Sequence, residues 1–252
     1  MIEYVNDRIM RVASGLSKDP QLGWIILVDK PYTWTSFDVV NKLRYCFRTN
    51  YGFKKIKIGH AGTLDPLATG LLIVCVGKET KNAERYMAEE KEYTGCFRVG
   101  ETTPSYDAET SVDEVFPERV LTMEELQTAA SSLEGQQWQI PPVFSAKKID
   151  GRRAYVSARK GQNLEIPPSN ISIMRLEIRD WRQPEADFYV KCSKGTYIRA
   201  LARDFGLALN SGAWLRSLRR VSSGGFRVEN ALTLEEAIDL IKFKSLNDSG
   251  LS

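Results

Sequence analysis

Residues 71 to 76, LLIVCV, form a short, continuous apolar run that Gly77 closes. A run of this length is typical of a strand buried on both faces of a sheet. Ile56 and Ile58 alternate with lysines just upstream, which predicts a half-buried strand. The chain between these two strands is rich in glycine, which allows backbone conformations that a Cβ atom forbids. The pattern therefore predicts a tight loop held between two strands of one sheet.

Asp65 lies in this loop and is followed by Pro66. A residue before proline favours extended geometry, and proline suits the first position of a helical turn, here residues 66–69. An isolated Asp-Pro pair would most often be a simple helix N-cap. The only histidine of the chain, His60, also lies in this loop, and permissive loops on rigid strands commonly carry chemistry. We therefore interpret Asp65 as a candidate site residue.

Composition excludes several classes of protein. The chain has 252 residues, of which 42% are hydrophobic and 27% charged, as in ordinary soluble proteins. It has no apolar segment long enough to span a bilayer and no secretory signal, so we expect a cytoplasmic protein. The four cysteines are widely spaced and there is one histidine, which argues against a zinc site and against a Ser-His-Asp triad.

The net charge of +3 hides three basic clusters. Residues 39–58 and 136–162 each hold six Lys or Arg, and residues 191–220 hold seven, with at most one acid per cluster. Charge runs are often only solvated faces. Aromatic residues are interleaved with these clusters, a pattern that favours a binding surface for a polyanion, and nucleic acid is the first candidate.

Strands and helices alternate without a regular βαβ repeat, which predicts an α+β fold with a mixed, largely antiparallel central sheet flanked by helices. Residues 1–22 show no clear period and are predicted to be an N-terminal extension. Residues 23–252 are predicted to form a single catalytic domain. Residues 136–165 are predicted to be an inserted, thumb-like hairpin and basic helix (152–160) that grips RNA, although an ordinary exposed meander would give a similar pattern.

Five motifs resemble those of the bacterial tRNA pseudouridine-55 synthases, the TruB type. They are LVDKPYTWTSFDVV (27–40), GHAGTLDPLATGLL (59–72), KEYTGCFRVG (91–100), CSKGTYIRALARDFG (192–206) and LRRVSSGGF (218–226). They occur in the family's order over nearly the whole chain.

The resemblance implies isomerisation of the T-loop uridine of tRNA to pseudouridine. The glycosidic bond breaks at N1, the uracil turns while held, and the ring rejoins the sugar through C5, without metal or cofactor. The implied partner is the T-arm of tRNA, bound by a monomer. A non-catalytic RNA-binding module and a hydrolytic nucleoside N-glycosidase are the alternatives.

By the same resemblance Asp65 is the catalytic carboxylate, and three roles stay open for it: attack on the sugar, attack on the base, or assistance of elimination at the ribose. Arg199 matches the arginine that orients this carboxylate, although a phosphate-binding arginine is the alternative. Tyr93 matches the tyrosine that stacks on the target base and is a candidate for removing the C5 proton. Tyr197 and Leu218 match residues that line the base pocket.

His60 matches the histidine that fills the gap left by the flipped base. Lys30, in a Lys-Pro motif, is expected to lie near the substrate. We expect it to support the loop rather than to take part in the chemistry. The residues expected to contact the RNA backbone are Lys147, Lys148, Arg152, Arg153, Arg219 and Arg220.

The chain departs from the family in two places. Pro104 stands where many members have an acid, so we expect Asp107 to be the partner of Arg199 instead. Only a short segment follows the predicted cap at Thr233, so we expect no C-terminal PUA domain.

Overall fold

The computed structural model describes residues 2–6, 9–12, 19–142, 148–149, 152–153 and 166–249. The chain forms two compact units. Unit 1 contains Met1–Lys91 and Arg219–Ser252, and unit 2 contains Glu92–Leu218. The chain passes between the units within strands β6 (Lys91–Val99) and β14 (Ala213–Ser223).

The sheet of unit 1 has the order β1-β2-β3-β5-β14, with β14 contributing its residues from Arg219 onward. Strand β4 also pairs with β5, β15 with β14, and β16 with β3. The strands are β1 (Ile2–Asn6), β2 (Ile9–Val12), β3 (Trp24–Lys30), β4 (Ile58–Ala61), β5 (Ala68–Val76), β15 (Phe226–Arg227) and β16 (Leu232–Thr233). The buried strand predicted at residues 71–76 is confirmed, and it is longer than expected because β5 begins directly after the Asp65 loop.

Strand β3 runs antiparallel to β5, from Trp24 opposite Val76 to Lys30 opposite Gly70. Strand β2 pairs with the other edge of β3, so residues 2–6 and 9–12 extend this sheet although their sequence shows no period.

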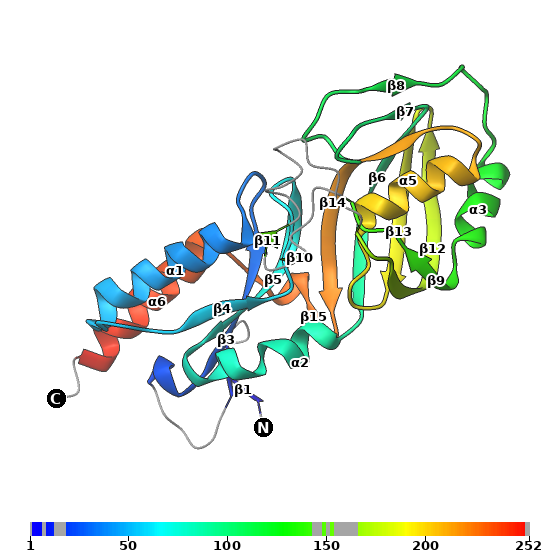
Figure 1. Cartoon of the computed structure of the whole chain (residues 1–252). Coiled ribbons are helices and arrows are strands. Elements are labelled where there is room, and N and C mark those ends of the chain that lie inside the picture. Colours follow the sequence, from blue (N-terminus) through cyan, green and yellow to red (C-terminus); the bar gives the residue numbers. More distant parts are fainter. Residues whose placement is uncertain are drawn as a thin grey trace. The chain divides into compact units, whose positions relative to one another are not determined.

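Helices α1 (Ser36–Tyr51) and α6 (Leu234–Ser249) lie side by side in unit 1 (Figure 1). Serine is a residue type favoured at helix N-caps, but the structure places Thr35 and not Ser36 at the N-cap of α1, in a capping box with Asp38. The apolar face of α1, including Val40, Leu43 and Phe47, packs in the same core as β3 and β5. The smaller helices are η1 (Pro20–Leu22), η2 (Gly77–Asn82), α2 (Ala83–Ala88) and η3 (Val228–Asn230).

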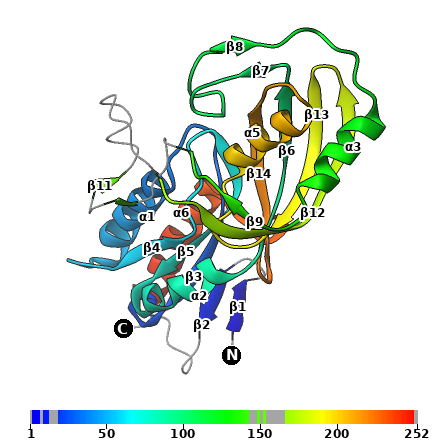
Figure 2. The ribbon, with the colours of Figure 1, turned by 45° about the vertical axis from the view of Figure 1, so that its right-hand side comes forward.

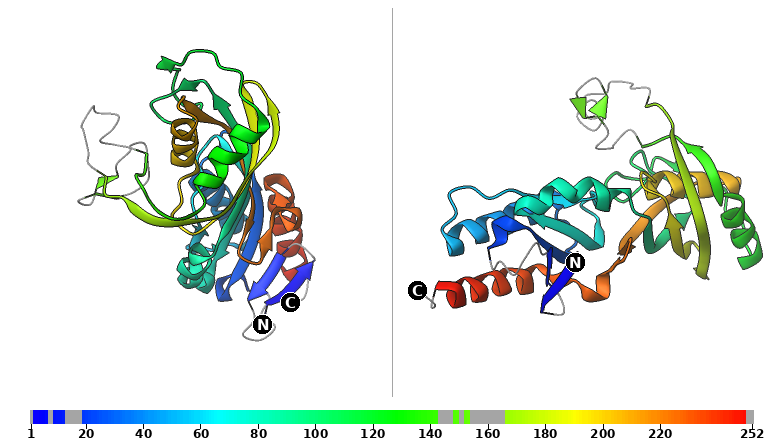
Figure 3. Two further views of the ribbon diagram at one scale, coloured as in Figure 1. Left: turned by 90° about the vertical axis from the view of Figure 1, so that its right-hand side faces the viewer. Right: turned by 90° about the horizontal axis from the view of Figure 1, so that it is seen from below.

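The sheet of unit 2 has the order β14-β6-β13-β12-β9. Its further elements are β7 (Glu101–Thr102), β8 (Glu114–Val115), α3 (Met123–Ser132), β9 (Gly135–Gln139), β10 (Lys148–Ile149), β11 (Arg152–Arg153), β12 (Ser169–Arg182), β13 (Glu185–Cys192) and α5 (Ile198–Ala208). Strand β12 is bent along its length (Figures 2 and 3), which agrees with two register shifts in its pairing with β13. The spacing of Thr122 and Glu125 is that of a capping box, and the structure forms this box at the start of α3.

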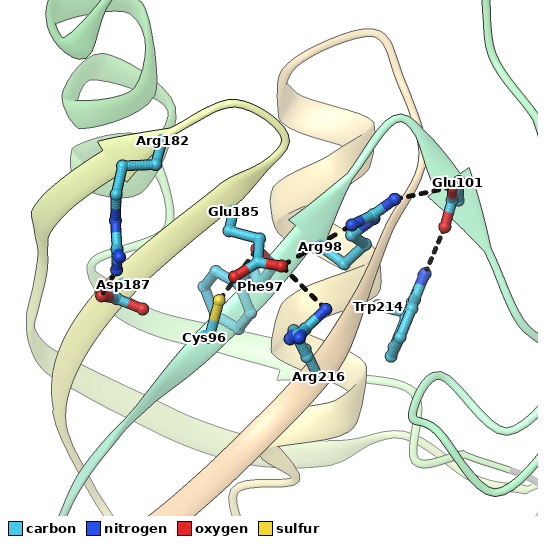
Figure 4. Close-up of polar contacts among 9 residues, drawn as sticks. All are labelled: Cys96, Phe97, Arg98, Glu101, Arg182, Glu185, Asp187, Trp214 and Arg216. Carbon is cyan, nitrogen blue, oxygen red and sulfur yellow. Dashed lines mark hydrogen bonds and ion pairs between the residues drawn. The ribbon is translucent and has the colours of Figure 1, made fainter.

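The core of unit 2 includes Phe97, whose ring stacks on that of Phe188 at a centroid distance of 3.9 Å. At the surface of the same strands, the carboxylate of Glu185 lies between the guanidinium groups of Arg98 and Arg216 (Figure 4). These contacts join β6, β13 and β14. The predicted site residues of this unit lie in these strands or in the segments between them.

The α+β fold with a largely antiparallel sheet flanked by helices is confirmed. Residues 148–149 and 152–153 pair as the predicted hairpin, so the basic helix predicted from Arg152 does not begin there. The rest of that helix lies outside the described residues. The division into an extension, one catalytic domain and an insert stays a prediction.

Candidate active site

The loop that carries Asp65 joins β4 to β5. The helical turn predicted after Pro66 is wrong. The chain makes a hydrogen-bonded turn, in which the amide of Ala68 donates to the carbonyl of Asp65 at 3.1 Å, and β5 begins at Ala68. Asp65 itself is half-buried.

Ser36, in the first turn of α1, holds the residue before Asp65. Its buried hydroxyl accepts a hydrogen bond from the amide of Leu64 at 2.8 Å and donates to the carbonyl of Leu64 at 3.0 Å. The sequence gives Ser36 only as a helix cap, and nothing in the local pattern indicates this contact with a residue 28 positions away.

Lys30, at the end of β3, holds the residue after Asp65. Its side chain is 0% exposed, and its Nζ atom donates to the carbonyls of Trp34 at 2.5 Å, Pro31 at 3.0 Å and Pro66 at 3.3 Å. Burial lowers the pKa of Lys30 to about 8, although the charge of Asp65 opposes this shift. The predicted support of the loop by Lys30 agrees with these contacts, and a direct substrate contact does not.

Arg220 was expected to bind the RNA backbone, and the structure corrects this. Its side chain is buried, with an exposure of 1%, and its guanidinium donates to the carbonyls of Leu71 at 2.7 Å and Gly62 at 3.1 Å. It therefore ties the start of the Asp65 loop to β5. The backbone of Arg220 also lies so close to Gly70 that a Cβ atom there would be 2.3 Å from its carbonyl oxygen.

Arg219 is more exposed and makes a two-point ion pair with Asp29, at 2.9 Å and 2.6 Å. RNA would have to compete with the carboxylate of Asp29 for this guanidinium group. The predicted contact of Arg219 with RNA stays a prediction.

His60 lies in β4, opposite Val74 of β5. Its Nδ1 atom is enclosed and has no hydrogen-bond partner among the described residues. Burial lowers the pKa of His60, and the nearby charge of Arg220 lowers it further. The ring is therefore neutral at neutral pH, which suits a group that would stand in for a stacked base.

In unit 2, Arg199 and Asp107 form a buried ion pair, with Nε 3.5 Å from Oδ2. Arg199 also donates to the carbonyl of Ser105 at 3.3 Å. The expectation that Asp107 is the acidic partner of Arg199 is confirmed. The predicted pairing of Arg199 with Asp65 joins residues of different units and stays a prediction.

Tyr93 is buried in β6, while Tyr197 and Leu218 are half-buried. The backbone of Tyr197 at the N-cap of α5 is held by Gln139, which accepts from its amide at 2.8 Å and donates to its carbonyl at 3.2 Å. The roles of these three residues at a flipped base stay predictions.

Unit 1 also has a hollow of about 680 Å³ with a basic lining, here called the basic hollow. Its charged side chains are Asp19 and the cations Arg44, Arg48, Lys54, Lys55, Lys57, Lys78 and Lys81. Arg44 donates to Asn41 and to the carbonyl of Ile58. Five of its cations belong to the first basic cluster of the sequence: Arg44 and the four at residues 48–57. Lys78 and Lys81 lie outside the predicted clusters, because they border an acid-rich segment.

The predicted RNA contacts of the insert lie outside the described side chains. Lys147 lies outside the described residues, and only the backbone is described for Lys148, Arg152 and Arg153. Within the described part of the chain, no three His, Cys, Asp or Glu side chains are arranged to hold a metal ion. No helix there has the length and apolar character needed to cross a membrane.

Comparison with known proteins places these features in a family. Residues 48–198, more than half of the chain, match the model of the TruB family pseudouridylate synthase, N-terminal domain. The chain belongs to the TruB family of pseudouridylate synthases. The region of this TruB-family chain that matches includes His60, Asp65, Tyr93 and Asp107.

Curated relatives of this TruB-family chain agree over nearly their whole length. A protein from Phocaeicola vulgatus named tRNA pseudouridine synthase B is 50% identical over 84% of this chain and 91% of its own. The protein of the same name from Flavobacterium johnsoniae is 49% identical over 84% of this chain and 93% of its own.

Among solved structures, a chain in the crystal structure of a Cbf5-Nop10-Gar1 complex is similar, with a TM-score of 0.68 and 26% identity. The match covers 92% of the TruB-family chain but only 57% of that chain. A structure of an H/ACA RNP bound to a substrate RNA matches with a TM-score of 0.65 and 24% identity, which supports the fold alone.

Proposed function

We propose that this chain isomerises uridine 55 in the T-loop of tRNA to pseudouridine. The observation that carries the proposal is the 50% identity, over 84% of the chain, to a protein named tRNA pseudouridine synthase B. The residue chemistry supports it, because cleavage at a sugar's anomeric carbon needs a carboxylate on a rigid support, and Asp65 lies on such a loop.

The loop around Asp65 fits this role because its neighbours are held from three sides. Ser36 binds Leu64, Lys30 binds the carbonyl of Pro66, and Arg220 binds the carbonyl of Gly62. A catalytic group must keep its position within a fraction of an ångström, and contacts of this kind provide that precision. In the proposal Asp65 and Arg199 are the catalytic pair, Tyr93 stacks on the uracil, and Tyr197 and Leu218 line its pocket.

The proposed reaction requires the uridine to leave its stack, which costs a few kcal/mol. His60 is proposed to occupy the vacated space, since a neutral ring replaces part of the lost stacking. The ring stays neutral because burial and Arg220 lower its pKa.

The RNA backbone is proposed to bind in the basic hollow. Apart from Arg44, its cations make no ion pair or hydrogen bond through their side chains with any described residue, so the repulsion among them is only partly offset, by the charge of Asp19. Phosphate groups would relieve it, and binding would weaken steeply with salt. The protein is proposed to act as a monomer in the cytoplasm, where tRNA is found. Light scattering across a concentration series checks the monomer, and a constant mass of about 28.5 kDa is expected.

Replacing Asp65 by Asn tests the proposal. The change keeps the size of the side chain and removes the charge and nucleophilicity of the carboxylate. We expect pseudouridine to form at position 55 in tRNA from a synthase-deficient strain with the wild-type protein, and none with Asp65→Asn. Equal formation with both would reject the catalytic role. Binding without any pseudouridine from either protein would indicate a non-catalytic RNA-binding module, and release of free uracil would indicate a hydrolytic N-glycosidase.

A further inference from the structure

A second hollow in unit 1 is lined by aromatic and polar side chains around the start of α1. It has a volume of about 530 Å³ and is here called the aromatic hollow. Its lining residues are Thr33, Trp34, Asp38, Asn41, Lys42 and Tyr45. None of these is among the residues that the sequence predicts for the site.

Aromatic side chains are unusually exposed around this hollow. Tyr45, which lines it, is 69% exposed, and Tyr32, which precedes the lining residue Thr33, is 56% exposed. Large aromatic side chains are normally buried, because each removes much apolar area from water when covered. Exposed aromatic rings gathered over one loop and one helix face indicate a surface that meets a ligand.

The hollow contains one carboxylate, Asp38, and one cation, Lys42. The carboxylate of Asp38 accepts hydrogen bonds from the amide of Thr35 at 3.0 Å and from its hydroxyl at 2.6 Å, and these bonds lower the pKa of Asp38. The carboxylate of Asp38 is therefore already hydrogen-bonded within the N-cap of α1. The side chain of Lys42 is exposed and makes no ion pair or hydrogen bond with a described residue, so its ammonium group can reach a ligand.

The loop before α1 is conformationally strained. Thr33 has a φ of 69°, in the left-handed region that a β-branched residue rarely adopts. Backbone strain of this kind is concentrated at functional sites, where the surroundings hold it in place. Here it fixes the segment that carries Tyr32 and Trp34.

The aromatic hollow adjoins the catalytic loop. The carbonyls of Trp34 and Pro66 both accept hydrogen bonds from the one Nζ atom of Lys30, and Pro66 directly follows Asp65. Lys30 thus ties the backbone of a hollow residue to the backbone of the residue after Asp65, so a nucleotide next to a uridine at Asp65 is the natural occupant of the hollow.

We propose that the aromatic hollow binds an unpaired nucleobase of the substrate RNA, adjacent to the uridine that is modified. The base stacks on Tyr45 and Trp34, and Lys42 contacts its phosphate. Stacking on aromatic side chains suits every base, so the hollow holds the RNA without reading its sequence. This inference rests on the proposed function, because it requires an RNA substrate at Asp65.

The test combines Tyr45 variants with abasic positions in the RNA. The probe is a synthetic T-arm stem-loop, intact or with one nucleobase removed at each loop position in turn, with binding measured by fluorescence anisotropy. Tyr45→Leu keeps apolar area but removes the ring, and Tyr45→Phe keeps the ring. We expect Tyr45→Leu to weaken binding of the intact RNA roughly tenfold, and Tyr45→Phe to bind as the wild type does.

One abasic position identifies the stacked base. There, base removal should weaken binding by the wild type but not weaken binding by Tyr45→Leu further, since the two changes remove the same contact. Phe37→Leu is the matched control, an exposed aromatic residue of the same helix that does not line the hollow, and its effects should be additive at every position. Additive effects of Tyr45→Leu at every position, or unchanged affinity, would overturn the inference. That outcome would not contradict pseudouridine formation that depends on Asp65. The proposed function is therefore tested separately from this inference.

Discussion

The hydroxyl of Ser36 binds both backbone groups of Leu64, the amide at 2.8 Å and the carbonyl at 3.0 Å. A single side chain of α1 thus fixes the peptide units on both sides of the residue that precedes Asp65. With Lys30 on Pro66 and Arg220 on Gly62, every second residue of the loop has a polar anchor from another element. Preorganisation of this kind reduces the free energy needed to orient the carboxylate in the transition state.

Ser36→Ala removes one of these anchors. The amide and carbonyl of Leu64 lose their partner in a buried position, which we expect to lower the free energy of unfolding by about 2 kcal/mol. We also expect the single-turnover rate of pseudouridine formation to fall roughly tenfold, with little change in RNA affinity. Urea unfolding and single-turnover kinetics with saturating enzyme measure the two effects.

Thr35→Ala is the matched control for Ser36→Ala. It removes the N-cap of the same helix, at a cost of about 1 kcal/mol, and leaves both bonds to Leu64 in place. We expect it to lower stability without slowing the chemical step. If both variants slowed the reaction equally, the effect of Ser36 would belong to the helix and not to the Asp65 loop.

Reversing two charges in the basic hollow tests its contact with RNA. Lys54 and Lys55 are exposed and line the hollow, and Lys54→Glu with Lys55→Glu should weaken binding of tRNA strongly at low salt. Each lost phosphate contact lowers the slope of log affinity against log salt by about 0.7 to 0.9. The slope should therefore fall by about 1.5, as measured by filter binding from 50 to 200 mM salt.

Arg227→Glu with Lys242→Glu changes the net charge by the same amount at positions of unit 1 outside the hollow. The slope of this control should stay near that of the wild type. An equal loss in both double variants would show that only the total charge of the protein matters.

His60 gives a pH-dependent prediction. Its pKa in the folded chain lies below the ordinary 6.5, because of burial and then the charge of Arg220. As the pH falls below about 6.5, the unfolded chain binds a proton at this position and the folded chain does not, so the folded state loses stability. We expect wild type to lose stability between pH 7 and pH 5 relative to His60→Gln, as measured by urea unfolding.

The same residue can be followed directly, because the chain has one histidine. The imidazole proton signals in an NMR titration should shift with a midpoint below pH 6.5. A midpoint at or above 6.5 would contradict the burial of the ring and its proposed neutral state at the vacated base position.

Regular elements were predictable from sequence where periodicity and caps act locally. The strands β3, β5, β12 and β13 and the capping box of α3 follow from apolar patterns and from residues three positions apart. The helical turn after Pro66 was wrong because a strand ladder with β3 extends to Gly70 and overrides the local preference of Asp-Pro.

Site residues were predictable by type but not always by role. Asp107 could be identified as the partner of Arg199 through the resemblance, because Pro104 stands where many family members have an acid and Asp107 lies three residues further on. Arg220 could not, because a basic cluster in sequence does not reveal which of two adjacent arginines turns inward in a strand. Arg219 and Arg220 point to opposite faces of β14, and only the second is enclosed.

Unit 1 is built from both ends of the chain, and this sets an order of events during synthesis on the ribosome. Arg220 is made 158 residues after Gly62, whose carbonyl it binds. At about 5–20 residues per second, the nascent loop waits roughly 8 to 32 seconds for this anchor. All of unit 2 has been polymerised by then, so a chain stalled before residue 219 carries Asp65 on a loop that is still incompletely braced.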